Sequence, residues 1–163
     1  MVTRSGDLDP SVVTEIMERE KLSPKEANSL LNKKSGLYGL TGLNPDFREI
    51  ELASYEADKP KATTAIEIFT KTIAEFVAKY AVSLKGLDVL VFTGGIGENQ
   101  INIRKKICEN LEWMGLKLDL AKNEVRSEET KVSAEDSKIL AYIIPTDEEM
   151  VIARDTKAIV ESL

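Results

Sequence analysis

The residues with the clearest chemical potential follow a short apolar segment in the second half of the chain. Leu87 to Phe92 is rich in β-branched and aromatic residues, and Gly94, Gly95 and Gly97 come directly after it. Glycine has no Cβ, so it permits positive φ and lets a ligand approach the backbone closely. From about Asn99 the pattern becomes helical. A strand, a glycine turn and a helix N-terminus together can bind an anion, because unpaired N–H groups and the helix dipole point the same way.

This glycine turn is not a complete phosphate-binding motif. It has neither the GxGxxG spacing nor the Gly-Lys-Ser/Thr ending of a P-loop. The residues alone therefore fit two alternatives, a tight turn in an ordinary α/β domain and a nucleotide site.

A group of carboxylates follows a second apolar segment. Ile139 to Ile144 predicts a strand, and Thr146 to Glu149 predicts a capping box with Thr146 as N-cap and Glu149 as its reciprocal partner. Glu148 is then free to hold a metal through water at the carboxyl end of a parallel strand. The alternative is that these acids only complement the helix dipole. Arg4, in a polar opening segment, reads by itself as a solvated terminal cation.

The elements before the glycine turn are predicted to be helices. Asp9 and Ser23 are N-caps followed by proline, and Ser23 with Glu26 forms a capping box. Gly36 is the expected C-cap of the second helix, and Leu37 to Leu43 is expected to be a loop. Further helices are predicted from Asn44 and, at greatest length, from Pro60 to the glycine at position 86.

The remaining chain alternates strands and helices. Leu87 to Phe92 is expected to be buried on both faces, as in a parallel sheet covered by helices. A helix from about Asn99 to Met114 carries Arg104 on a solvated face, and a half-buried strand follows over Leu116 to Leu120. Residues 1–85 are thus mainly helical and residues 86–163 form a strand/helix part, which predicts an α/β fold with a large helical layer on a small, mostly parallel sheet.

Composition narrows the classes of function. The net charge of -6 argues against nucleic acid and anionic membrane as partners. The chain has no histidine, so catalysis would use carboxylates, cations, backbone amides or a bound metal, an inventory that suits phosphoryl transfer. One cysteine, the lack of a long apolar run and the lack of a signal peptide favour a cytoplasmic location.

Four stretches taken together resemble the acetate kinase family of carboxylate phosphotransferases. They are TRSGDLDP (residues 3–10), DFR (46–48), FTGGIGEN (92–99) and PTDEE (145–149). The resemblance covers essentially the whole chain and corresponds to the C-terminal half of such an enzyme. It implies one truncated lobe, residues 1–163, of an actin-like, ribonuclease H-like phosphotransferase that transfers the γ-phosphoryl group of ATP to acetate, giving acetyl phosphate and ADP.

The resemblance also implies roles for individual residues. Arg4 matches the arginine that stabilises the transferred phosphoryl group, and Glu148 matches the carboxylate associated with Mg²⁺. The residues expected at the nucleotide, ATP or ADP, are Asp46, Phe47, Arg48, Gly94, Gly95, Ile96, Gly97, Glu98 and Asn99. Asp147 departs from the asparagine usual in the family.

Other readings remain open from the sequence. The family's N-terminal lobe carries the acyl site, so this chain by itself is expected to be inactive and cannot separate acetate kinase from propionate or butyrate kinase. A non-catalytic nucleotide-binding or dimerisation module is the third alternative, because the resemblance implies a homodimer.

Overall fold

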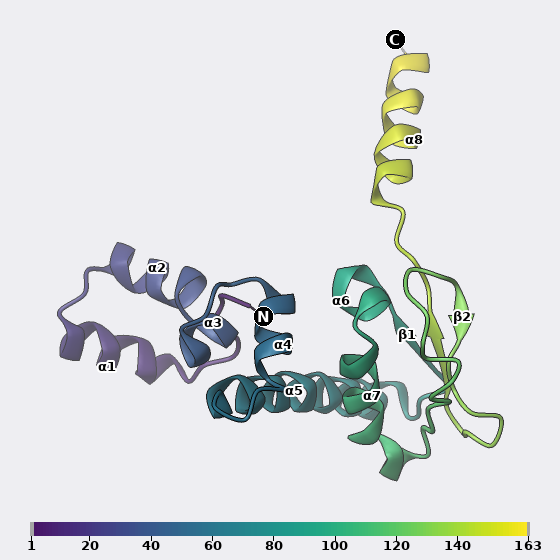
Figure 1. Cartoon of the computed structure of the whole chain (residues 1–163). Coiled ribbons are helices and arrows are strands. Elements are labelled where there is room, and N and C mark those ends of the chain that lie inside the picture. Colours follow the sequence, from purple (N-terminus) through teal and green to yellow (C-terminus); the bar gives the residue numbers. More distant parts are fainter. Residues whose placement is uncertain (1, 163) are drawn as a thin grey trace. The chain divides into compact units, whose positions relative to one another are not determined.

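The computed structural model describes residues 2–162, except for the side chain of Glu148. The chain divides into two compact units, Met1–Thr72 and Ile73–Leu163. The boundary lies inside the long helix α5 (Pro60–Leu84), which begins at the predicted proline (Figure 1).

The helices of the first unit begin at the predicted capping residues. Before α1 (Pro10–Glu20), the Asp9 carboxylate accepts a hydrogen bond from the N–H two residues later at 2.8 Å. Before α2 (Pro24–Lys33), Ser23 and Glu26 form both hydrogen bonds of the capping box. These starts are confirmed, since each side chain satisfies N–H groups that have no partner within the helix.

The segment after α2 is a short helix, so the prediction of a loop over Leu37 to Leu43 is wrong. Gly36 has φ 62° and opens α3 (Gly36–Thr41) instead of capping α2. Leu37 is 3% exposed. Burial of this side chain stabilises a short helix that its two glycines, at the first position and in the interior, would disfavour in isolation.

The core of the first unit includes α4 and the first half of α5. α4 (Phe47–Ala53) begins after the N-cap Asp46, later than the predicted start at Asn44. Ile50 is fully buried, and the rings of Phe47 and Phe69 lie 5.0 Å apart. Ala65 and Ile66 of α5 are buried as well, so the first half of this helix packs as core, whereas Tyr80 and Leu84 near its end are exposed.

The second unit contains a three-stranded sheet with the order β1-β3-β2. β1 (Val89–Phe92) pairs in parallel with β3 (Leu140–Ile143), with Phe92 opposite Ile143. β2 (Thr130–Lys131) pairs antiparallel with the other side of β3. The predicted α/β fold with a small, mostly parallel sheet is confirmed.

Strand β1 is not buried on both faces, which corrects the sequence prediction. Val89 is 45% exposed and Val91 is 43% exposed, whereas Phe92 is buried. β1 is an edge strand of this sheet, and Val89 and Val91 are only partly covered. An apolar run alone does not reveal whether a second layer is present.

The elements after β1 are shorter than predicted. The glycine turn is itself a helix, α6 (Gly94–Asn99), and α7 (Ile101–Glu109) and the 3₁₀ helix η1 (Glu112–Met114) replace one helix from Asn99 to Met114. Leu116 and Leu118 make only isolated β-bridges, so no strand forms over Leu116 to Leu120.

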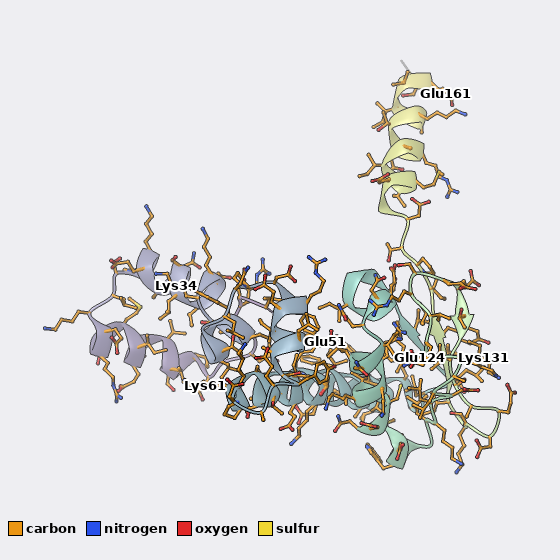
Figure 2. The ribbon with its side chains drawn as sticks, viewed as in Figure 1. Lys34, Glu51, Lys61, Glu124, Lys131 and Glu161 are labelled. Carbon is orange, nitrogen blue, oxygen red and sulfur yellow. The ribbon has the colours of Figure 1, made fainter. Side chains whose placement is uncertain are left out.

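The last helix, α8 (Glu148–Glu161), follows β3 after a four-residue connection that ends at Asp147. All of its described side chains are exposed (Figure 2). Within residues 2–162, no helix combines the length and apolar character needed to cross a membrane.

Candidate functional site

The three glycines of α6 have different environments. Gly94 has φ 70°, a conformation that favours glycine. A Cβ on Gly97 would lie 3.2 Å from the backbone carbon of Phe92, so this position lacks room for a side chain. Gly95 has neither constraint, because its φ is ordinary and a Cβ there would meet nothing within 4 Å. The fold alone does not require Gly95.

The buried carboxylate of Glu98 lies at the start of its own helix. Oε1 accepts hydrogen bonds from the Gly94 N–H at 2.7 Å and from the Thr146 N–H at 2.9 Å. The side chain is 8% exposed. Its pKa is held below the ordinary value, most strongly by the Thr146 N–H bond and despite desolvation. The anion that these N–H groups bind is therefore the chain's own Glu98 carboxylate.

Hydroxyl and amide groups join the turn after β1 to two other segments. The Thr93 and Thr146 hydroxyl oxygens lie 2.6 Å apart. Asn99 donates to the Gly95 carbonyl at 3.1 Å and accepts from the Ser127 hydroxyl at 3.0 Å. These contacts tie the ends of two parallel strands and a distant loop to one short helix.

Arg104 is fully buried, so its predicted place on a solvated face is wrong. Its guanidinium donates to the carbonyls of Gly97 and Glu98 at 3.0 and 2.9 Å. It also donates to the side chain and carbonyl of Asn123 at 2.8 and 2.7 Å, and to the Val125 carbonyl at 2.8 Å. The fixed fork of donors makes arginine suited to such a set of acceptors.

The burial of Arg104 has an electrostatic cost. Desolvation lowers its pKa, and nearby Arg126 lowers it further. No carboxylate in the described chain forms an ion pair with it, and its hydrogen-bond partners are all carbonyl oxygens, of the backbone and of the Asn123 side chain. The helical spacing of its neighbours is the one local hint of this burial, although it does not identify the acceptors. Arg104, Cys108 and Leu111 recur at helical spacing on one face of α7 and its end, and all three are buried.

The segment around Arg4 is held in place by the first unit. Ser5 N–H donates to the Leu31 carbonyl at 2.9 Å, and Ser35 N–H donates to the Thr3 carbonyl at 3.0 Å. Tyr38 N–H donates to the carbonyl of residue 2 at 2.9 Å. The opening segment is therefore an ordered loop beside the end of α2.

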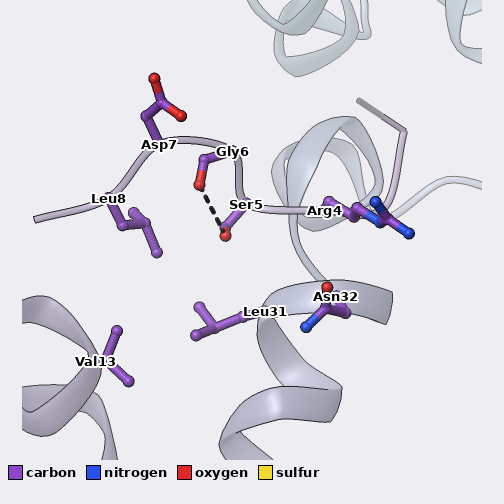
Figure 3. A pocket seen from close by; sticks show the side chains of 8 residues that line it. All are labelled: Arg4, Ser5, Gly6, Asp7, Leu8, Val13, Leu31 and Asn32. Carbon is purple, nitrogen blue, oxygen red and sulfur yellow. Dashed lines mark hydrogen bonds between the residues drawn. The ribbon is translucent and has the colours of Figure 1, made fainter. Parts of the chain in front are cut away.

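A cavity of about 460 Å³ lies beside this loop (Figure 3). Leu8, Val13 and Leu31 line its apolar side, and Arg4, Ser5, Gly6, Asp7 and Asn32 complete it. The Arg4 side chain is exposed, and within residues 2–162 its guanidinium has no hydrogen bond or ion pair. The structure thus presents an unpaired cation from an ordered backbone.

In the DFR stretch, Asp46 and Arg48 form an exposed pair, whereas Phe47 is buried. Arg48 donates from Nε and Nη2 to the two Asp46 carboxylate oxygens at 3.2 and 2.8 Å, and Asp46 also caps α4. These hydrogen bonds lower the pKa of Asp46 and raise that of Arg48. The Arg48 side chain is 75% exposed. The Phe47 ring is buried against Phe69 and is part of the core.

The acidic start of α8 differs from its prediction. Asp147, not Thr146, is the N-cap, and its Oδ1 accepts from the Met150 N–H at 2.9 Å. Asparagine caps helices equally well, so aspartate at this position keeps the cap. The side chain of Glu148, the predicted magnesium-associated carboxylate, lies outside the described part of the chain. Among the described residues no group of three acidic or cysteine side chains could hold a metal ion.

The predicted site residues therefore fall into two sets. Arg4, Asp46, Phe47 and Arg48 belong to the first unit, while the α6 residues and Glu148 belong to the second. Within the second unit, the Glu98 carboxylate brings the start of α6 together with the connection that leads to α8.

Comparison with known proteins gives one consistent result. The model of the acetokinase family matches residues 1–154. The acetate kinase of Treponema denticola is 50% identical over 161 residues, which cover 99% of this chain and 40% of that protein. The crystal structure of Porphyromonas gingivalis acetate kinase has a TM-score of 0.89 at 45% identity, covering 98% of this chain and 40% of that one.

A propionate kinase from Francisella tularensis has a TM-score of 0.85 at 42% identity, covering 94% of this chain and 38% of its own. The chain thus spans about two fifths of the length of the relatives it matches. With the family model matching nearly the whole sequence, this chain belongs to the acetokinase family.

Proposed function

We propose that this chain is the nucleotide-binding part of an acetate kinase. In the proposed reaction, an oxygen of acetate attacks the γ-phosphorus of ATP, and the bond from that phosphorus to the oxygen bridging to ADP breaks. The products are acetyl phosphate and ADP, and the reaction is reversible. Phosphoryl transfer of this kind depends on positioning and charge stabilisation, which matches a chain without histidine.

Gly95 is the observation that carries this proposal. It is exposed, its backbone has ordinary geometry, and space beside it is open. Glycine in a helix costs about 0.5 kcal/mol or more relative to alanine. A glycine that the fold does not need is explained by the close approach of a ligand to the backbone. We assign Gly94, Gly95, Ile96 and Gly97 to the side of the loop that lines the nucleotide.

Arg4 is proposed to stabilise the phosphoryl group during transfer. Its guanidinium is exposed and has no partner in the described chain, yet its backbone is fixed by hydrogen bonds to α2 and α3. A guanidinium stays charged and offers several donors in fixed geometry, which suits the oxygens of a transferring phosphoryl group.

Asp46 and Arg48 are proposed to contact the nucleotide through the exposed guanidinium plane. The two hydrogen bonds from Asp46 fix the orientation of Arg48. A planar guanidinium can stack on an aromatic ring such as a base. Phe47 then supports this pair by packing α4 against α5.

Mg²⁺ is the proposed metal, and Glu148 is the residue assigned to it. Asp147, Glu148 and Glu149 are hard oxygen donors at the start of α8, and Mg²⁺ commonly binds one or two carboxylates together with substrate phosphates. The donor chemistry therefore fits the ion without a complete protein cage. Bound there, Mg²⁺ would neutralise charge on the nucleotide phosphates.

Acetate is the proposed acyl substrate, with a homodimer in the cytoplasm as the expected setting. Propionate is the second candidate, because one similar structure is a propionate kinase. A hydroxamate assay of a full-length version with each acid would decide between them. The 163-residue chain alone is expected to bind nucleotide without turnover, and robust acetyl phosphate formation by it would contradict this.

The direct test is calorimetric titration of this chain with Mg-ADP. We expect binding in the wild type and a loss of about tenfold or more in G95A, because a methyl group would block the approach of the ligand. G95A should be slightly more stable than the wild type, by about 0.5 kcal/mol. G94A is the matched control and should be less stable, because Gly94 has positive φ. Equal ADP affinity in G95A and the wild type would refute the assignment.

A further inference from the structure

The turns that follow β1 and β3 are joined by one side chain. The two strands are parallel neighbours, and their last paired residues are Phe92 and Ile143. Beyond them, Glu98 Oε1 accepts from the Gly94 N–H at 2.7 Å on one turn and from the Thr146 N–H at 2.9 Å on the other. Ligands of parallel α/β sheets bind at this carboxyl edge. Glu98 therefore connects the two turns from which such a ligand would be held.

The surroundings of Glu98 leave its carboxylate little freedom to contact a ligand. The side chain is 8% exposed, and Oε2 lies 3.5 Å from the Ser127 hydroxyl. In the described chain it forms no ion pair, and Arg104 bonds to the Glu98 carbonyl instead of its carboxylate. Gly94 N–H is in turn engaged by Glu98. Both groups therefore form internal structure and are not free donors or acceptors for a nucleotide.

We propose that Glu98 is a positioning residue, whose carboxylate holds the glycine loop α6 against the Thr146 turn and so fixes where Glu148 stands relative to that loop. This inference rests on the proposed function, in which α6 lines the nucleotide and Glu148 serves Mg²⁺. Thr146 lies two residues before Glu148, and Asp147 between them caps α8. A shift of the Thr146 turn would therefore move the start of α8.

The variants E98Q and E98D separate the effect of side-chain length at position 98 from the effect of its charge. Glutamine at position 98 keeps the length and an Oε1 acceptor, and loses the charge. Aspartate keeps the charge and is one methylene too short to bridge the two N–H groups. If Glu98 works by position, E98Q retains function and E98D loses it. If Glu98 contacts the nucleotide or the metal through its charge, the order is reversed.

The first measurement is amide hydrogen exchange of Gly94 and Thr146 by NMR in this chain. We expect slow exchange of both amides in the wild type and E98Q, and fast exchange of both in E98D, because only the short side chain releases them. Fast exchange of both amides in the wild type would overturn the tie. The matched controls are E109Q and E109D on the exposed face of α7, which should leave both amides unchanged.

The second measurement is the affinity for ADP with and without Mg²⁺. We expect E98D to lose about tenfold in affinity for Mg-ADP, and E98Q to stay within about threefold of the wild type. E98D should also lose the gain in ADP affinity that Mg²⁺ provides. If aspartate only lowered the stability of the chain, the molecules that remain folded would still show this gain. Equal losses in E98Q and E98D, or a larger loss in E98Q, would overturn the proposal.

Failure of the proposed function gives a different pattern. A wild-type chain that binds no ADP contradicts the nucleotide assignment, and with it the role of Glu98 in setting Glu148. The exchange experiment then still decides whether Glu98 ties the two turns together. Slow exchange that depends on the length of residue 98 upholds the tie by itself.

Discussion

The glycine loop and the Arg4 segment are held in opposite ways. Buried side chains fix the backbone of α6, with Glu98 at its start and Arg104 at its end. Backbone hydrogen bonds fix the Arg4 segment, and its side chain is left unpaired within the described residues. The glycine loop thus exposes main chain, which a closely approaching nucleotide requires. The Arg4 segment exposes a charged side chain, which stabilisation of a phosphoryl group requires.

This difference predicts how each region responds to mutation. Side chains that hold the glycine loop also satisfy buried polar groups, so their loss should lower stability together with ligand binding. Arg4 satisfies no group in the described chain, so its loss should affect activity alone. The contrast between the two regions should be greatest for replacements of Arg104, which lower stability, and of Arg4, which lower activity.

Replacement of Arg104 should have the largest effect on stability. R104M removes five hydrogen bonds and leaves the carbonyls of Glu98 and Asn123 buried, and those of Gly97 and Val125 part-buried, without this partner. We expect the free energy of unfolding to fall by at least about 3 kcal/mol, measured by urea denaturation. R104K should also destabilise the chain, because an ammonium group cannot reproduce the planar fork.

The matched control for R104M is K105M on the same helix. Lys105 lies 3.9 Å from Glu109 at the surface, and its side chain is 46% exposed. Its replacement should change stability by less than about 0.5 kcal/mol. Similar small changes in both variants would show that Arg104 does not anchor the loop.

Local signals in the sequence predicted the helix starts of the first unit. Asp9 and Ser23 cap helices as expected, because capping depends on residues within one turn of each other. The strand before the glycine loop and the strand that ends before Pro145 were also predicted, since short apolar segments bounded by turns are typical of strands. The glycine loop itself was found by residue type and order, and its assignment to the nucleotide stays a prediction.

Features that depend on distant partners were missed. The burial of Arg104 requires Asn123 and Val125 from a later loop, and nothing local marks those acceptors. The role of Glu98 requires Thr146, which is 48 residues away in the sequence. Exposure of Val89 and Val91 depends on what covers the sheet. Sequence patterns report local geometry, whereas these properties are set by tertiary contacts.

Replacement of Arg4 should separate activity from stability. R4A should lower turnover in a full-length version by about 100-fold or more, because a preorganised donor to the transferring group is lost. The stability of the 163-residue chain should change by less than about 0.5 kcal/mol, since its guanidinium has no partner in the described structure.

The control for R4A is R19A. Arg19 is an exposed arginine that pairs with Glu15 on α1, and its replacement should leave turnover unchanged. A large loss of stability in R4A would contradict the division between the two regions. Unchanged turnover in R4A would contradict the catalytic assignment.

The capping box of α2 should give the smallest effect. α2 supports the Arg4 segment through the Leu31 carbonyl near its C-terminal end, whereas Ser23 and Glu26 act at its N-terminus. S23A should cost about 1 kcal/mol of stability and leave the exchange of the Ser5 amide unchanged relative to global unfolding. Fast local exchange at Ser5 would mean that the two ends of the helix are coupled.

Glu26 gives this cap a dependence on pH with a defined sign. Hydrogen bonds from the Ser23 hydroxyl and N–H lower the pKa of Glu26 below its ordinary value. A lowered pKa in the folded state contributes stability above the unfolded value, and that contribution is lost as the pH falls through the folded value. E26Q should therefore lose less stability than the wild type between about pH 5 and pH 3, as measured by urea denaturation across that range. An equal loss of unfolding free energy in E26Q and the wild type over this pH range would show that the cap does not depend on the ionised carboxylate.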